Sequence, residues 1–383
     1  MKVLITTPTY PPFNSGLGNA VQQQATALVA KGISVVVATG GKARAQRIDE
    51  ISGALIEEFN IQGADYLLNP IRGDIQTYEN FLRGSAFDVI LMNAWQTWTT
   101  DLCLRNSQEI SGRKLLYSHC VSTNMFFWRQ PLRSLIRYLF WRPYWWKLSS
   151  LVRRLDGLIF LAPEGCDSRF DDLMLARKLS VPLHFLPNAL SPSALAMLNK
   201  PAHERYKRDQ FIAIGSFDWL KGHDFVLRAY ADSAAKNIVP LKIFGQAHSD
   251  FSARLRDLAL ELGIEDQYVT LHEGVSGDKL LEECGHSIAI LSGSHTECQP
   301  LVLLDAMAAG VPFIARRSGC IPSLPGGVAV DSVTEMVHAI DNFLHADEQN
   351  WMCLSDAGRC YVATYCDPLG FGKKLLAVIG GVV

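Results

Sequence analysis

Three charged residues lie within or next to apolar stretches of the sequence, and they are candidates for binding or catalysis. Glu297 lies in the polar segment 292–299, and Asp305 lies within the apolar run L-V-L-L-D-A-M-A-A. Lys221 directly precedes a run with helical apolar periodicity. A carboxylate in apolar surroundings is costly unless it has partners, and lysine is a compact charge suited to a phosphate. The alternatives are that Asp305 caps a neighbouring loop and that Glu297 and Lys221 are solvated surface charges.

The segment 285–317 has the pattern of a β-α-β unit. It reads as strand, polar loop, buried helix and strand, at 287–291, 292–299, 301–309 and 311–315. Pro300 suits a helix start, because the first helical N–H has no partner to lose, and Gly310 suits the left-handed turn that ends a helix. Ligands of open α/β sheets bind at the carboxyl ends of strands, where a helix N-terminus offers N–H groups to a phosphate. Glu297 is therefore predicted to lie at a ligand-binding edge.

Two motifs in this half of the chain resemble a known family. The run E-C-Q-P-L-V-L-L-D-A-M-A-A-G-V-P is similar to the E-x7-E signature of the retaining glycosyltransferases of family 4, with Asp305 at the second Glu. G-S-F-D-W-L-K-G resembles the family's G-R-x-x-x-x-K-G loop, with Ser216 at the arginine. The resemblance implies an α/β protein of the GT-B fold. Two Rossmann-like doubly wound parallel-sheet domains would then face each other across a cleft.

The resemblance also implies a role for each matching residue. Glu297 would hold hydroxyls of the donor sugar, Asp305 would hold ribose hydroxyls, and Lys221 would grip the donor diphosphate. Because this chain has Ser216 at the position of the family's arginine, it lacks the fixed positive charge that the arginine provides. The donor-binding residues implied in this half of the chain are Ser216, Lys221, Val275 beside the base, Glu297, Pro300, Leu301 and Asp305, and no metal is expected.

The N-terminal half has its own candidates. Strand 2–7, loop 8–18 and helix 19–30 start a doubly wound sheet, and Gly16 and Gly18 in the loop permit close approach of a ligand. A tight turn is the alternative. P-T-Y-P-P-F-N-S-G-L-G is similar to the family's opening loop beside the donor pyrophosphate. L-L-Y-S-H resembles the family segment whose histidine contacts the transferred sugar or its phosphate, which gives His119 a catalytic role beside Glu297 and Lys221. A merely packed histidine is the alternative.

Short apolar runs predict the remaining strands and hence the domains. They lie at 33–38, 88–92, 114–118, 157–162 and 183–187, and then at 211–215, 241–245, 268–271 and 326–330. We expect an acceptor-side domain at 1–190, a linker at 191–210 and a nucleotide-sugar-binding domain at 211–366. The resemblance implies that a last helix, about 367–383, packs back on the first domain.

The segment 111–155 combines basic and aromatic residues and contains no acid. Arg129, Arg133 and Arg137 are four residues apart and therefore share one helical face. Together with Trp141 and Trp145 they form a candidate membrane or acceptor surface, because basic and aromatic side chains suit an anionic membrane interface. An amphipathic helix whose aromatics pack in the core is the alternative.

Composition excludes several classes of protein. The chain has 383 residues and a net charge of −2, which gives no global sign of a nucleic-acid partner. It has no run of about 18 apolar residues that could span a bilayer, and the N-terminus reads as a strand, not a signal peptide. Nine cysteines without a C-x-x-C spacing argue for a reducing compartment and against structural zinc. We therefore expect a cytoplasmic protein, with peripheral contact to the inner face of the membrane as an added hypothesis.

The resemblance implies a glycosyltransferase that moves a sugar from a nucleotide-diphosphate donor to an acceptor with retention, without a cofactor. A glycan or lipid-linked acceptor is the expected partner, as in surface-polysaccharide synthesis, and no nucleic acid is expected. Two alternatives stay open: a degenerate GT-B protein that binds nucleotide or membrane without catalysis, and a GT-B sugar-nucleotide epimerase. A Rossmann dehydrogenase is disfavoured because Val21 replaces the third glycine of its fingerprint.

Overall fold

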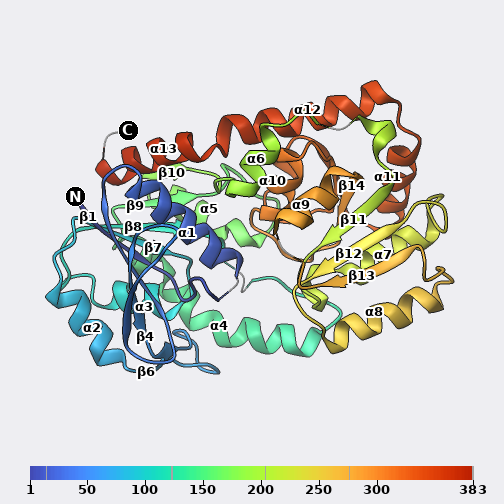
Figure 1. Cartoon of the computed structure of the whole chain (residues 1–383). Coiled ribbons are helices and arrows are strands. Elements are labelled where there is room, and N and C mark those ends of the chain that lie inside the picture. The colour runs from blue at the N-terminus through green and yellow to red at the C-terminus, as the bar shows by residue number, and fades with distance from the viewer. Residues whose placement is uncertain (14, 122–123, 203, 276, 382–383) are drawn as a thin grey trace. The chain divides into compact units, whose positions relative to one another are not determined.

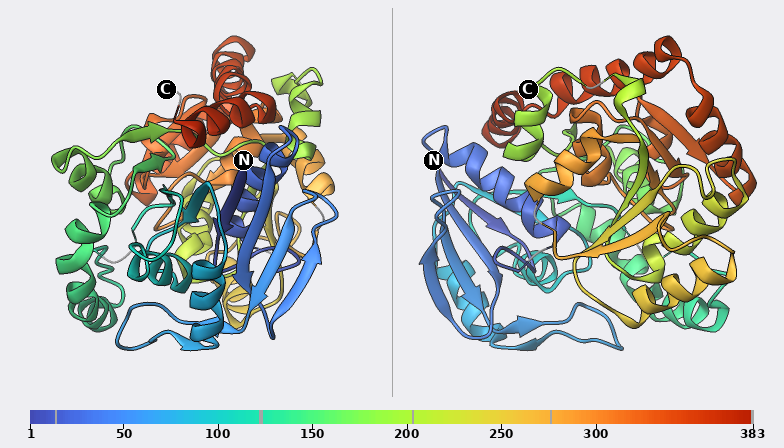
Figure 2. Two further views of the ribbon diagram at one scale, coloured as in Figure 1. Left: turned by 90° about the vertical axis from the view of Figure 1, so that its left-hand side faces the viewer. Right: turned by 45° about the vertical axis from the view of Figure 1, so that its right-hand side comes forward.

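The computed structural model describes residues 1–13, 15–121, 124–202, 204–275 and 277–381, which form two compact units (Figure 1). The first unit comprises Met1–Ala189 and Pro368–Val383, and the second comprises Leu190–Asp367. Each unit is built on one main sheet with helices packed against it (Figure 2).

The sheet of the first unit has the strand order β10-β9-β8-β7-β1-β2-β4-β3 and is parallel except for the β3–β4 pair. Its strands are β1 (Lys2–Thr6), β2 (Ser34–Gly40), β3 (Ala45–Ile48), β4 (Leu55–Phe59), β7 (Val89–Asn93), β8 (Arg113–Ser118), β9 (Gly157–Phe160) and β10 (Leu183–Phe185). A separate two-stranded ribbon joins β5 (Ile61–Gln62) and β6 (Arg72–Gly73). The chain adds strands first on one side of β1 and then, from β7, on the other, so the switch point lies between β1 and β7.

The helices of the first unit are α1 (Gly16–Val29), α2 (Ile75–Gly84), α3 (Trp98–Arg105), α4 (Pro131–Val152), α5 (Asp171–Lys178) and α13 (Pro368–Gly380). The terminal helix α13 packs against α1, where a Cβ on Gly372 would lie 3.4 Å from Ala27. None of the described helices combines the length and apolar character needed to cross a bilayer.

The sheet of the second unit is parallel throughout, with the order β13-β12-β11-β14-β15-β16. Its strands are β11 (Gln210–Ile214), β12 (Leu241–Gly245), β13 (Val269–Glu273), β14 (Ser287–Ser292), β15 (Phe313–Arg316) and β16 (Gly327–Val330). β12 and β13 extend one side of β11, and β14 to β16 extend the other. The switch point therefore lies between β11 and β14, whose following loops border it.

The helices of the second unit are α6 (Pro192–Leu198), α7 (His223–Asp232), α8 (Asp250–Glu261), α9 (Gly277–Gly285), α10 (Leu301–Ala308), α11 (Val333–His345) and α12 (Glu348–Tyr365). The described residues of the stretch 191–210, predicted as a linker, group with this unit. α6 packs on α9 and α10, and the buried Arg208 donates hydrogen bonds to the carbonyls of Ser287 and Gly310. These hydrogen bonds tie Arg208 to the ends of two elements of the second unit.

Candidate functional site

The two loops at the switch point of the second unit are locked together through their backbones. The first follows β11 and ends at Gly222, and the second follows β14 and begins at Gly293. A Cβ on Gly222, which has φ +61°, would lie 2.0 Å from the Gly293 carbonyl oxygen, and a Cβ on Gly293 would lie 2.1 Å from that of Gly222. Only glycine permits this approach. The His295 N–H also donates to the Leu220 carbonyl at 2.8 Å, so the two loops form one rigid rim.

This rim brings Lys221 and Glu297 into contact, although they are far apart in the sequence. The Lys221 ammonium donates to the Glu297 carboxylate with an Nζ–Oε1 distance of 2.8 Å, and the two side chains are 34% and 14% exposed. A turn after β15 fixes the backbone of Glu297, because Gly319 packs against the Glu297 carbonyl and the Cys320 N–H donates to Cys298 at 3.0 Å. A positive and a negative group are thus held at the edge where a ligand of this sheet would bind.

Two helices begin at this rim at N-cap residues whose own side chains do not cap them. α7 starts after Gly222 and α10 starts after Pro300, and neither of these two residues makes a side-chain capping hydrogen bond. Unsatisfied N–H groups and the helix dipole both favour an anion. Together with Lys221, the two helix ends provide a positive environment for a diphosphate without a second basic side chain from the first loop.

Ser216, at the position of the family's arginine, lies in a turn and makes a hydrogen bond within it. Its hydroxyl donates to the Asp218 carboxylate at 2.5 Å, and the other carboxylate oxygen of Asp218 accepts the Leu220 N–H. Residues 215–222 contain one basic residue, Lys221. The positive potential of this loop therefore comes from Lys221 and the helix end, and the serine serves the turn.

Arg316 stabilises the rim through a contact with His295, and this role was not predicted from the sequence. Arg316 ends β15, its guanidinium lies 2.7 Å from His295 Nδ1, and it stacks over the Phe225 ring at 5.1 Å. His295 in turn packs against Trp219 in the first loop. Sequence adjacency could not show this contact, because it depends on β15 lying beside β14.

Asp305 lies in the second turn of α10, partly screened from solvent. Burial raises the pKa of its carboxyl from 3.8 to about 7. The thiol of Cys284 on α9 has its own pKa raised to about 12, by burial and secondarily by the Asp305 charge. A carboxyl without a compensating cation is destabilising when ionised. Such a group is a functional-site candidate, because a ligand that donates hydrogen bonds would stabilise the carboxylate.

The same sheet topology positions three further predicted donor-binding residues, Val275, Pro300 and Leu301. Pro300 and Leu301 form the start of α10. Val275 follows β13 and the left-handed Gly274, at the carboxyl edge of the same sheet. Its contact with a base stays a prediction.

His119 belongs to a polar cluster at the carboxyl ends of β7 and β8 in the first unit. Its Nε2 lies 3.1 Å from Asn93 Oδ1, which also accepts from Gln24 Nε2 at 2.9 Å. In the tautomer with the proton on Nε2, His119 donates to Asn93 Oδ1 and its Nδ1 is an acceptor. Desolvation lowers the pKa of His119 from 6.5 to about 4. The imidazole is therefore neutral near pH 7 and can accept a hydroxyl hydrogen bond but cannot neutralise a phosphate.

Gly16 and Gly18 lie in the first turn of α1, and not in the preceding loop as predicted. Ser15 caps this helix and accepts the Gly18 N–H at 3.0 Å. A Cβ on Gly18 would lie 2.9 Å from Ser15 Oγ and 3.1 Å from the Thr9 carbonyl oxygen. Gly18 is thus required for close packing of the opening loop on α1, and neither glycine has a positive φ.

The five residues of the predicted membrane surface divide into an exposed and an inward set. Arg129 and Arg133 are exposed. Arg137 is half-buried and donates to the Met125 carbonyl at 2.5 Å. Trp141 is only 9% exposed and stacks on Tyr66 with a centroid distance of 4.4 Å, and Trp145 is half-buried. Trp141 is therefore a core residue, which corrects its assignment to the surface.

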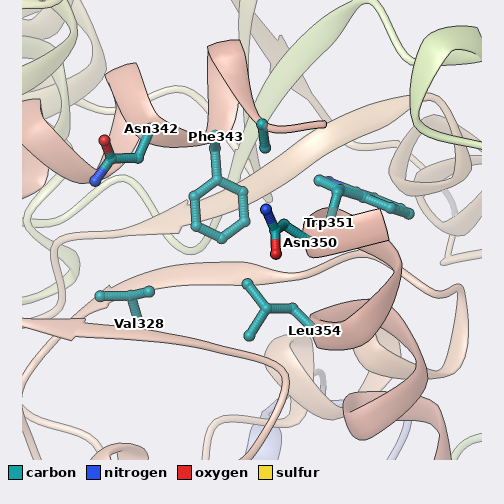
Figure 3. A pocket seen from close by; sticks show the side chains of 7 residues that line it. Val328, Asn342, Phe343, Asn350, Trp351 and Leu354 are labelled. Atoms are coloured by element: carbon teal, nitrogen blue, oxygen red, sulfur yellow. The ribbon is translucent and has the colours of Figure 1, made fainter. Parts of the chain in front are cut away.

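The second unit also contains a cavity away from this rim. A cavity of about 330 Å³ lies between α11, α12 and β16 (Figure 3), lined by Val328, Asn342, Phe343, Ala346, Asn350, Trp351 and Leu354. No ionisable side chain lines it, so it offers no positive charge to a phosphate. Within the described parts of the chain, no cluster of three or more His, Cys, Asp and Glu residues is placed to hold a metal ion.

The sequence of this chain is similar to those of known glycosyltransferases. Residues 198–351 match the family model of glycosyl transferases group 1. The MMP alpha-(1->4)-mannosyltransferase of Mycolicibacterium hassiacum is 28% identical over 198 residues, which cover 48% of this chain and 45% of that protein. An uncharacterized glycosyltransferase of Haemophilus influenzae is 27% identical over 248 residues, or 60% of this chain and 66% of that protein. The matches thus span about half to two thirds of these relatives.

Solved structures extend the similarity to the whole chain. Sucrose-phosphate synthase of Thermosynechococcus elongatus has a TM-score of 0.73 at 18% identity and covers 100% of this chain and 98% of its own. Anabaena HepE, solved in complex with UDP, has a TM-score of 0.70 at 15% identity and full coverage of both chains. These likenesses show the GT-B fold.

Proposed function

We propose, from the GT-B fold and the match of residues 198–351 to glycosyl transferases group 1, that this chain transfers a sugar from a nucleoside-diphosphate donor to an acceptor hydroxyl. The observation that carries the proposal is the contact between Lys221 and Glu297 beside the N-termini of α7 and α10, at the switch point of the second sheet. Structures of the similar Anabaena HepE contain UDP and UDP-glucose, which supports a donor of this class.

The charges of the site match the charge changes of glycosyl transfer. Breaking the bond between the anomeric carbon and the diphosphate leaves positive charge on the sugar and negative charge on the leaving group. Lys221 and the N-termini of α7 and α10 stabilise that negative charge, and such preorganised donors contribute most in the transition state. The diphosphate attracts Lys221 away from Glu297, which frees the carboxylate to accept sugar hydroxyls. Asp305 accepts the ribose hydroxyls.

Retention of configuration is part of the proposal, by resemblance to the family. The leaving phosphate then takes the proton of the attacking acceptor hydroxyl, so no side chain is needed as nucleophile. The neutral state of His119 suits this scheme, because its Nδ1 can accept a hydrogen bond from a sugar hydroxyl without competing for the phosphate charge.

The proposal is tested by nucleoside diphosphate release from a panel of UDP-, GDP- and ADP-sugars, with and without simple glycan and glycolipid acceptors. We expect release from one donor, and a fall of about 10²–10³-fold in Glu297→Ala, because the sugar loses its fixed hydrogen-bond acceptor. Glu283→Ala is the matched control, since Glu283 also pairs with a lysine, Lys242, at 2.7 Å in the same unit. Equal activity in the Glu297→Ala variant and wild type would contradict the assignment.

Metal independence is a separate prediction. Lys221 and the helix ends supply the positive potential that a divalent cation would otherwise provide, so turnover is expected to be unchanged by EDTA. The measurement is the initial rate after exhaustive chelation, compared with the rate after adding back Mg²⁺ or Mn²⁺. A rate that collapses on chelation and returns with either cation would show that these groups are insufficient.

A degenerate GT-B protein is the second candidate, favoured by the neutral Ser216 turn and by the shorter acid at Asp305. Such a protein would bind a nucleoside diphosphate but release none from its sugar. A thermal shift with UDP, GDP or ADP in the absence of release from every donor and acceptor would establish this candidate. An epimerase would instead convert the donor to the nucleotide of the epimeric sugar without any acceptor and without net release of nucleoside diphosphate.

A further inference from the structure

The helix α4 carries two apolar stripes, and only one of them faces the core of the first unit. The inner stripe contains the buried Ser134, Trp141, Tyr144 and Leu148. The outer stripe consists of Leu132, Leu135, Leu139 and Trp146, which are 70%, 47%, 55% and 76% exposed. Positions separated by three, four and seven residues fall on one helical face, so the outer stripe is continuous. A packed helix of a soluble unit normally exposes polar residues on that face.

The apolar surface extends beyond the helix. Trp128 precedes α4 and is 84% exposed. Leu67, in the segment 64–75, is 70% exposed. It borders a cavity of about 430 Å³ between that segment and α4, and Phe140 of α4 borders the same cavity. Exposed apolar surface of this extent marks an interaction site.

The charged side chains of the segment 111–155 are all basic. No acid occurs between Glu109 and Asp156, and Arg129 and Arg133 are exposed. The Lys147 side chain is 60% exposed and pairs with Asp65, beside Leu67, at 3.7 Å. Arg137 and Arg142 lie over aromatic rings of the same segment. An outward apolar stripe with basic residues beside it and aromatic residues at both ends has the composition of a helix that lies in the interface of an anionic bilayer.

We propose that the outer stripe of α4, with Trp128 and the flanking Arg129 and Arg133, docks the protein on an anionic lipid surface. The helix lies parallel to the bilayer, with the leucines and Trp146 among the acyl chains near the headgroups and the arginines on the lipid phosphates. This inference rests on the proposed function and assigns the acceptor to a class, namely a sugar carried by a lipid. Membrane docking itself does not depend on catalysis.

The test uses the full chain in flotation with vesicles of phosphatidylcholine alone and with about 30% phosphatidylglycerol. Wild type is expected to float with the anionic vesicles at least about tenfold more than with the neutral ones, and to be released by high salt. Leu135→Glu combined with Leu139→Glu should lower flotation about tenfold, because two charges would enter the apolar interface. Trp128 and Trp146 should blue-shift in emission on binding, and Trp128→Phe with Trp146→Phe should reduce that shift.

Leu260→Glu is the matched control, because Leu260 on α8 is 59% exposed but lies in the other unit. It should float like wild type. Flotation of the Leu135→Glu/Leu139→Glu variant at the wild-type level would overturn the proposal, as would failure of wild type to float. A wild-type dimer that the double variant dissociates, without flotation of either, would assign the surface to a second copy of this chain. The thermal shift with nucleotide in lipid-free buffer reports the donor site separately and should be equal in all these variants.

Discussion

Lys221→Ala is expected to lower kcat/KM for the donor by about 10²–10³-fold, because a preorganised positive group is removed from the leaving diphosphate. The loss should appear mainly in kcat, since the leaving group gains negative charge only as the glycosidic bond breaks. Stability should change little, because a partly exposed ion pair contributes about 0–1 kcal/mol. The measurement is steady-state nucleoside diphosphate release with the donor that the panel identifies.

Lys242→Ala controls for the loss of an ion pair as such. Lys242 contacts Glu283 at 2.7 Å with exposures of 29% and 24%, close to those of the Lys221–Glu297 pair. Lys242 lies within β12, however, and not in a loop at the switch point. Activity of the Lys242→Ala variant should stay near that of wild type. If both variants lose activity to a similar degree, the effect belongs to the unit's structure and not to the diphosphate.

The parallel sheets were predictable because buried parallel strands read as short apolar runs, whereas the GT-B fold was implied by the resemblance of the motifs to a known family. Every strand predicted from such a run is present, within a few residues of its predicted ends. The order of elements placed Lys221 and Glu297 in loops that follow strands of one sheet, but the contact between them was not predicted and is seen only in the structure. The predicted GT-B fold is confirmed by the similarity to solved structures over the whole chain.

Segment 42–87 could not be predicted, because its strands carry charges that only their partners explain. β4 has the sequence L-I-E-E-F, which does not read as a buried strand. Glu57 is 4% exposed and pairs with Arg44 and Gln46, and Glu58 pairs with Arg47. These cross-strand pairs of β3 and β4 satisfy the carboxylates, but the partners cannot be identified until the antiparallel register is known.

The basic aromatic segment shows a different limit of sequence reasoning. Spacing predicted a shared face for Arg129, Arg133 and Arg137, but could not decide which face of the helix meets the core. α4 is apolar on both of its faces, so the pattern was compatible with either orientation. The stack of Trp141 on Tyr66 fixes the inner face, and it leaves the leucine stripe outside.

Asp305→Asn is expected to make the free protein more stable above neutral pH and to weaken nucleotide binding. The folded-state pKa of Asp305, about 7, lies above the ordinary value of 3.8. The folded chain therefore holds this proton more tightly than the unfolded chain, so the free energy of unfolding falls as pH rises from about 4 to about 7. Asparagine does not ionise and avoids this loss.

The stability difference between the Asp305→Asn variant and wild type should be near zero at pH 4 and reach on the order of 2 kcal/mol at pH 8, after allowance for partial solvent access. Nucleoside diphosphate affinity should fall about 10- to 100-fold at pH 8, because hydrogen bonds from ribose hydroxyls to a carboxylate are stronger than those to an amide. Thermal melts across this pH range and calorimetric titration give the two quantities. Asp257→Asn, at an exposed position on α8, should change neither.

A more stable variant with weaker binding would show that Asp305 is held in an unfavourable state that its ligand relieves. Residues kept only for packing do not behave in this way, because their replacement changes stability without a separate effect on the ligand. Higher stability with unchanged nucleotide affinity would contradict the ribose role and leave Asp305 as a tolerated buried acid. Lower stability at pH 8 would contradict the raised pKa itself. The Asp305→Asn variant thus tests, at one residue, whether the acid of the second motif serves the donor or the fold.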